Sequence, residues 1–160
     1  MKKLIFGLII LISITSVKLF CYDFYLKIYY LKGEKSKDSH SSEEYITIKS
    51  NNVSYSITYS GRRGDSDVDA DKSCTFTNNN IDNIKNTIIM GELNVVDSLF
   101  EQETKYKEFE TYCNLTIDIE MGGNPYSIRI NGETEEFKNK NLYKNSLFLI
   151  SMIKEMLGGC

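Results

Sequence analysis

Four aspartates alternate with other residues in one acidic segment of the chain. Asp65, Asp67, Asp69 and Asp71 occupy every second position, so an extended backbone puts their carboxylates on one side. Carboxylates that repel one another in this way are typical ligands of a hard cation such as calcium. The segment departs from the helix-loop-helix calcium motif, because alanine stands at its glycine position and phenylalanine at that of its bidentate glutamate. We interpret the segment as a solvated acidic loop, with weak calcium binding as the alternative.

Four cysteines bear on the redox chemistry of the chain. Cys74 shares one side of a predicted strand with a phenylalanine, and Cys113 shares one side of another with a leucine, so both are expected to point inward. We predict a disulfide between Cys74 and Cys113, and two buried free thiols are the alternative. Cys160 ends the chain after two glycines and is a candidate for pairing with Cys21 or with another molecule.

No constellation of residues in the sequence is typical of an enzyme. The one histidine, His40, lies in a polar, serine-rich segment, so serine and cysteine nucleophiles lack a base held by regular structure. Cysteine and histidine are not spaced as zinc ligands, and no glycine-rich phosphate loop opens a predicted helix. The sequence therefore predicts a protein that is not an enzyme and that has no cofactor apart from the calcium alternative.

The first 21 residues have the layout of an export signal. Two lysines follow Met1, residues 4–14 form an apolar run, and Thr15 and Ser16 follow that run ahead of Lys18 and Cys21. The residue directly before Cys21 is Phe20 and not the small residue typical of a lipoprotein signal. The run is shorter than the roughly 20 residues of a membrane-crossing helix. The sequence therefore predicts an extracytoplasmic protein that is secreted, periplasmic or membrane-anchored. Cys21 is a candidate lipidation site, and cleavage without lipid and an uncleaved anchor are the alternatives.

The composition is that of a folded acidic domain. Hydrophobic residues make up 41% of the chain and charged residues 26%, which excludes wholesale disorder. There are 19 basic and 22 acidic residues, and three of the lysines lie in the export signal. This balance repels phosphate backbones and anionic lipids, so we predict no nucleic-acid partner. Contact with a membrane is expected only through the N-terminal segment or a lipid on Cys21.

Alternating hydrophobic residues predict a β-sheet. Residues 22–31 are rich in aromatic and branched side chains and predict a strand, with a tether from the membrane as the alternative. The polar, serine-rich residues 33–44 predict a loop or a flexible linker. Residues 45–49 and 53–60 predict a hairpin. Residues 109–121 predict a long half-buried strand, because alternate positions are apolar over the whole segment. A further strand over residues 126–130 is expected to return beside it.

Two helices complete the predicted fold. Apolar residues recur at helical spacing over residues 81–90 and 141–157. Residues 61–73 predict a long polar loop, and Asn131 with Gly132 predicts a tight turn. The order of the elements predicts an α+β fold, specifically a two-layer sandwich of an antiparallel β-sheet with two helices packed on one face.

We expect three segments along the chain, of which only the last is a folded domain. Residues 1–21 form the signal peptide or lipoprotein signal, residues 22–44 an N-terminal strand and linker, and residues 45–160 a single α+β domain.

Helices on one face of the sheet leave the opposite face as the expected site of recognition. That face is predicted to display Tyr45, Lys49, Tyr112, Asp118 and Arg129. Tyrosine and arginine are enriched at protein interfaces, so the expected partner is another protein. The sequence therefore predicts a small exported binding protein, such as an inhibitor or an immunity-type protein. The alternative is a structural or accessory protein of the cell envelope.

Overall fold

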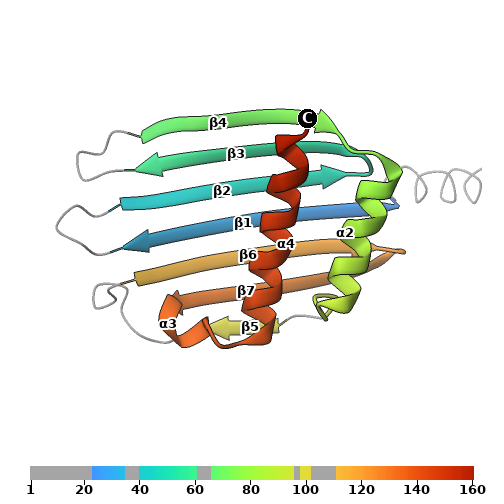
Figure 1. Ribbon diagram of the computed structural model, residues 1–160. Coiled ribbons are helices and arrows are strands. Elements are labelled where there is room, and N and C mark those ends of the chain that lie inside the picture. Colours follow the sequence, from blue (N-terminus) through green and yellow to red (C-terminus); the bar gives the residue numbers. More distant parts are fainter. Residues whose placement is uncertain (1–22, 35–39, 61–65, 96–97, 102–110) are drawn as a thin grey trace, which may run out of the picture.

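The computed structural model describes residues 23–34, 40–60, 66–95, 98–101 and 111–160 (Figure 1). The predicted export signal, with Cys21, lies outside the described residues. None of the helices in the described ranges combines the length and hydrophobicity needed to cross a membrane.

The described residues form seven strands and three helices. The strands are β1 (Phe24–Glu34), β2 (His40–Lys49), β3 (Asn52–Ser60), β4 (Ser66–Thr75), β5 (Ser98–Glu101), β6 (Thr111–Met121) and β7 (Asn124–Glu133). The helices are α2 (Asn78–Met90), α3 (Thr134–Phe137) and α4 (Asn141–Gly158). The predicted hairpin, the long strand and both long helices are confirmed.

All seven strands belong to one sheet in the order β4-β3-β2-β1-β6-β7-β5. Six of them pair antiparallel, and the short β5 adds to β7 in parallel. β1 is a central strand, since it pairs with both β2 and β6 along its length.

Because β1 lies at the centre of the sheet, the expected domain boundary at residue 45 is wrong. Buried Phe24, Leu26 and Ile28 tie β1 into the core, and β2 begins at His40 inside the expected linker.

Hydrophobic residues at alternate strand positions form the core on the side of α2 and α4. Figure 1 shows both helices in front of the strands. The Tyr30 hydroxyl on β1 lies 3.1 Å from the Tyr143 hydroxyl on α4, and the Lys154 ammonium on α4 lies 2.8 Å from the Glu44 carboxylate on β2. α2 begins where the Thr77 hydroxyl accepts a hydrogen bond from the Asn80 amide. The α+β class of the fold is confirmed.

Two predictions of irregular structure are wrong. Most of the expected loop over residues 61–73 belongs to β4, because a polar sequence can still form an edge strand against a well-formed neighbour. The expected turn at Asn131 and Gly132 is part of β7, where Gly132 has a φ of 147° that favours glycine. β7 then leads directly into α3.

Candidate functional site

The face of the sheet turned away from α2 and α4 is here called the open face. Strand pairing places all five predicted recognition residues on it: Tyr45 and Lys49 on β2, Tyr112 and Asp118 on β6, and Arg129 on β7. Their sequence neighbours on these strands, such as Ile46 and Ile117, are fully buried on the opposite face. The alternation of each strand was enough to predict this placement.

A tyrosine cluster, formed by Tyr29, Tyr45 and Tyr112, lies on the open face. The rings of Tyr29 and Tyr45 are 5.0 Å apart at an interplanar angle of 47°. Tyr45 is 41% exposed, and its hydroxyl donates a hydrogen bond to the Glu43 carboxylate at 3.3 Å. The Tyr112 ring covers Gly33 so closely that a β-carbon there would collide with it.

The phenols of Tyr29 and Tyr45 stay neutral at physiological pH. Burial raises the pKa of Tyr29 above its ordinary value of 10.0, and the negative charge of Glu43 adds to the effect. Burial and the same carboxylate raise the pKa of Tyr45. The cluster therefore offers flat rings with hydroxyl tips that both donate and accept hydrogen bonds.

Charged residues of both signs surround the tyrosines. Lys27 on β1 stands between Thr47 of β2 and Asp118 of β6. The Asp118 carboxylate accepts a hydrogen bond from the Ser127 hydroxyl of β7 at 2.9 Å, which fixes its position. The open face thus carries a patterned mixture of charges without one dominant sign.

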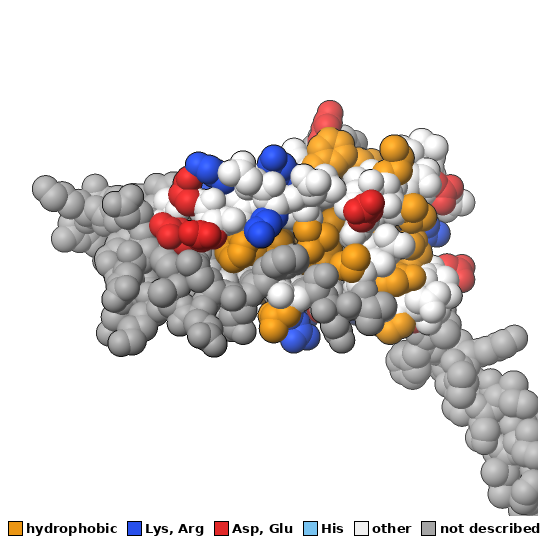
Figure 2. Space-filling model, turned by 90° about the horizontal axis from the view of Figure 1, so that it is seen from below, with side chains coloured by type: hydrophobic (Ala, Val, Ile, Leu, Met, Phe, Trp, Pro, Cys, Tyr) orange, Lys and Arg blue, Asp and Glu red, His pale blue; other side chains and the backbone are white. Residues whose placement is uncertain are grey.

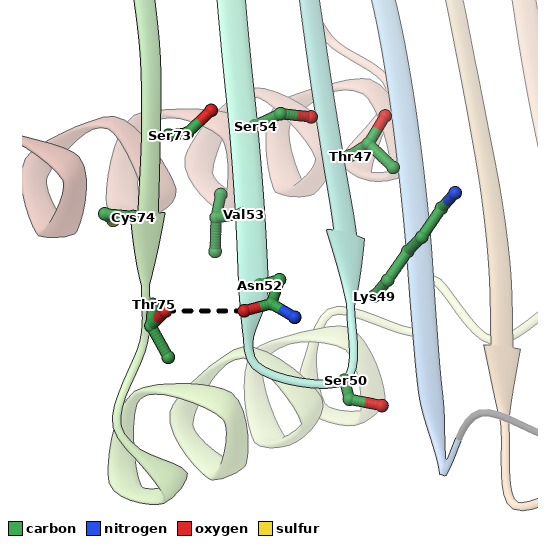
Figure 3. Close-up of a pocket in the computed structure, with 9 residues that line it drawn as sticks. All are labelled: Thr47, Lys49, Ser50, Asn52, Val53, Ser54, Ser73, Cys74 and Thr75. Atoms are coloured by element: carbon green, nitrogen blue, oxygen red, sulfur yellow. Dashed lines mark hydrogen bonds between the residues drawn. The ribbon is translucent and has the colours of Figure 1, made fainter.

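Two hollows adjoin each other on the open face. The larger has a volume of about 750 Å³, and Figure 3 shows the residues that line it, with Lys49 reaching across toward β1. Hydroxyl-bearing and amide side chains dominate its lining, and Thr75 donates a hydrogen bond to Asn52 at 3.3 Å. The second hollow, of about 310 Å³, includes Tyr25, the strand partner of Lys49. These open depressions suit contact with side chains of a larger partner.

A smaller apolar hollow lies between the two long helices. It has a volume of about 200 Å³, and Met90 and Phe148 contribute to its wall. Both side chains are largely exposed, as is Leu99 on β5. Figure 2, seen from the β5 side of the molecule, shows hydrophobic side chains gathered among polar ones. This region forms a second exposed surface, separate from the tyrosine cluster.

Three of the four candidate calcium ligands belong to the edge strand β4. Asp65 lies outside the described residues, and Asp67, Asp69 and Asp71 belong to β4. A register shift interrupts the alternation of β4, since Ala70 pairs with Ile57 and Val68 pairs with Thr58. Within the described ranges, no three histidine, cysteine, aspartate or glutamate residues are grouped as metal ligands.

The predicted disulfide between Cys74 and Cys113 is wrong. Cys74 is bonded to Cys160, with their Cα atoms 6.2 Å apart, and Cys113 is a buried free thiol on β6. Three strands separate β4 from β6 in the sheet, which puts their backbones about 19 Å apart at the usual strand spacing. A disulfide joins Cα atoms less than about 7 Å apart, so Cys74 and Cys113 cannot be joined.

The sequence prediction of the site missed the contribution of β1. Tyr25, Lys27 and Tyr29 occupy alternate positions of this central strand and fill the open face between β2 and β6. The alternation of residues 24–31 already contained this signal, because Phe24, Leu26 and Ile28 are apolar at the intervening positions. The strand was predicted, but it was placed outside the domain.

No family model matches the chain, and comparison with curated proteins finds no significant match.

Proposed function

We propose that the chain is a small exported binding protein that recognises another protein through the open face of its sheet. The observation that carries this proposal is the tyrosine cluster, where the tilted rings of Tyr29 and Tyr45 pack together and the Tyr112 ring lies against Gly33. Rigid tyrosines lose little conformational entropy on binding and offer both apolar area and hydrogen bonds.

The proposal includes the two-layer packing of the sandwich. Contacts from α4 to β1 and β2, and the Lys85 ammonium 5.6 Å from the centre of the Phe24 ring, support a helical layer on one side. In this arrangement the helices cover the apolar face and leave the tyrosine cluster accessible. A partner then meets a surface that does not need to rearrange before binding.

The chemistry of the open face favours a protein over other ligands. Lys27, Lys49 and Arg129 are balanced by Glu43, Asp118 and Glu120, so the face lacks the positive stripe that phosphate backbones require. Its hollows are open rather than enclosed, unlike the pockets that bury a small molecule. An inhibitor or an immunity-type protein would use such a face to cover the site of its target.

Export is the second part of the proposal. The Cys74–Cys160 disulfide is compatible with an oxidising compartment, where such bonds persist. The export signal at residues 1–21 is the sequence feature that supports this location.

An affinity experiment with variants of the exposed face tests the proposal. The chain is immobilised, and partners are recovered from the cells that produce it and identified by mass spectrometry. Tyr45→Ala and Arg129→Glu are expected to weaken capture of a partner at least tenfold, because both residues are exposed on the open face.

Lys144→Ala on the outer surface of α4 serves as the matched control and is expected to leave capture unchanged. Melting temperatures are measured for all three variants to establish that each is folded. Equal capture by Tyr45→Ala, Arg129→Glu and the unaltered chain would refute recognition through the open face.

A further inference from the structure

We infer that the open face packs against the open face of a second copy of this chain. The inference rests on the proposed function, because it names the partner of the same surface. The strand register fixes the order of charges and rings across five neighbouring strands.

Four rows of side chains cross the centre of the open face from β3 to β7. The first row is Asn52, Lys49, Tyr25, Glu120 and Pro125, and the second is Ser54, Thr47, Lys27, Asp118 and Ser127. The third row is Ser56, Tyr45, Tyr29, Thr116 and Arg129, and the fourth is Thr58, Glu43, Leu31, Asn114 and Asn131.

A two-fold axis in the plane of the interface, perpendicular to the strands and between the second and third rows, makes this pattern self-complementary. The first row of one copy then meets the fourth row of the other, which sets Lys49 against Glu43 twice in the dimer. Tyr25 meets Leu31 in the same way. The second row meets the third, which brings Lys27 over the ring of Tyr29.

No charge meets a charge of the same sign in this arrangement of the four rows. Asp118 faces Thr116, Glu120 faces Asn114 and Arg129 faces Ser127. The other in-plane axis, which runs along β1, also sets Lys49 against Glu120 twice, but it places Lys27 against Lys27 on the axis itself. The perpendicular axis is favoured because it gives two opposite-charge contacts and no like-charge contact within the four rows.

The dimensions of the face fit a weak but specific dimer. At the usual spacings five strands span about 24 Å and four rows about 27 Å, so the two faces together cover on the order of 1,300 Å². That area is at the lower limit for a specific interface. Two packed sheets cross at roughly 30°, which shifts the outer rows by about one strand spacing, and the long lysine side chain can bridge that shift.

A charge-swap experiment tests the inference. The chain is purified as cells produce it, and its mass is followed by sedimentation equilibrium up to about 200 μM, where a micromolar dimer is populated. Lys49→Glu alone and Glu43→Lys alone are each expected to weaken the dimer at least tenfold, since each places two like-charge contacts in it.

Combining the two substitutions in one chain is expected to restore the dimer, and mixing the two single variants is expected to give a heterodimer. Residues 43 and 49 lie six positions apart on β2, about 20 Å along the strand, so rescue cannot arise within one chain. Lys144→Ala is the matched control for loss of a surface lysine, and circular dichroism establishes that every variant is folded.

A monomeric unaltered chain at every concentration would overturn the inference, as would failure of both the double variant and the mixture to restore the dimer. A different result distinguishes failure of the dimer from failure of the proposed function. A monomer that still loses capture of a different protein on Tyr45→Ala would contradict the second copy as partner while supporting recognition through the open face.

Discussion

The Tyr112 ring on β6 covers Gly33 on the neighbouring strand β1, where the absence of a side chain leaves room for the ring. The pairing register sets the two residues directly opposite each other. An aromatic ring over a strand glycine shields the backbone that glycine leaves exposed. The same contact holds one member of the tyrosine cluster flat on the open face.

Gly33→Ala is expected to displace the Tyr112 ring with little effect on folding. The new methyl group occupies the place of the ring, while alanine restores some of the strand stability that glycine forgoes, so the free energy of unfolding should stay within about 1 kcal/mol of the original. Urea denaturation measures the stability, and the NMR shifts of the Tyr112 ring report its displacement. The same substitution in a Tyr112→Ala chain is the control. Unchanged Tyr112 shifts in Gly33→Ala would show that the ring does not depend on the glycine.

Lys154→Met is expected to lower the free energy of unfolding by about 1 to 2 kcal/mol at neutral pH. The substitution leaves the Glu44 carboxylate buried without its ammonium partner, and the partial exposure of Lys154 limits the loss. Methionine keeps the apolar stem of lysine, so little packing is lost. Lys144→Met on the exposed side of α4 is the matched control and is expected to cost less than about 0.5 kcal/mol.

The effect of Lys154→Met is expected to disappear at alkaline pH. Burial lowers the pKa of Lys154, but its hydrogen bond to Glu44 and the charge of that carboxylate outweigh burial and raise the pKa above the ordinary 10.5. A raised pKa means that the stabilisation is complete below pH 10.5 and is lost as the pH rises through the pKa of the folded state. Urea denaturation of both proteins at several pH values measures the gap. A gap that persists unchanged well above pH 11 would contradict the role of the ion pair.

Peptide mapping without reduction is expected to recover Cys74 joined to Cys160, with Cys113 as a free thiol. Because the bond closes a loop between residues 86 positions apart, Cys160→Ser should lower the free energy of unfolding by up to about 4.5 kcal/mol in the chain-entropy model. Cys113→Ser is the control and is expected to leave the map unchanged. A peptide that joins Cys74 to Cys113 would refute this pairing.

The sequence predicted which face each strand residue occupies and which strands form hairpins, but not the order of the hairpins in the sheet. Alternation over residues 109–121 correctly placed Cys113 in the core and Asp118 on the open face. It carried no information on the order of the hairpins, and this is why Cys74 was paired with a cysteine on a strand four positions away in the sheet. Order depends on contacts between segments distant in the chain, such as β1 between β2 and β6.

Polar strands were the other source of error. The residues of β4 lack an apolar alternation, so the sequence predicted a loop, yet hydrogen bonding to β3 supports an edge strand there. Glu44 was assigned to a linker because it is charged and ends a polar segment. In the structure it is buried on β2, where the Lys154 ammonium, 110 residues later in the chain, donates a hydrogen bond to its carboxylate. A polar strand or a buried carboxylate of this kind can be predicted only when the segment that pairs with it is known.

Site-specific photo-cross-linking tests the central claim, recognition through the open face, most directly. A photoreactive phenylalanine analogue replaces Tyr45 on the open face or, in a second chain, the exposed Phe148 on α4. Illumination in the producing cells is expected to give a discrete cross-linked product at position 45 and none at position 148. A product at position 148 with none at position 45 would contradict the claim.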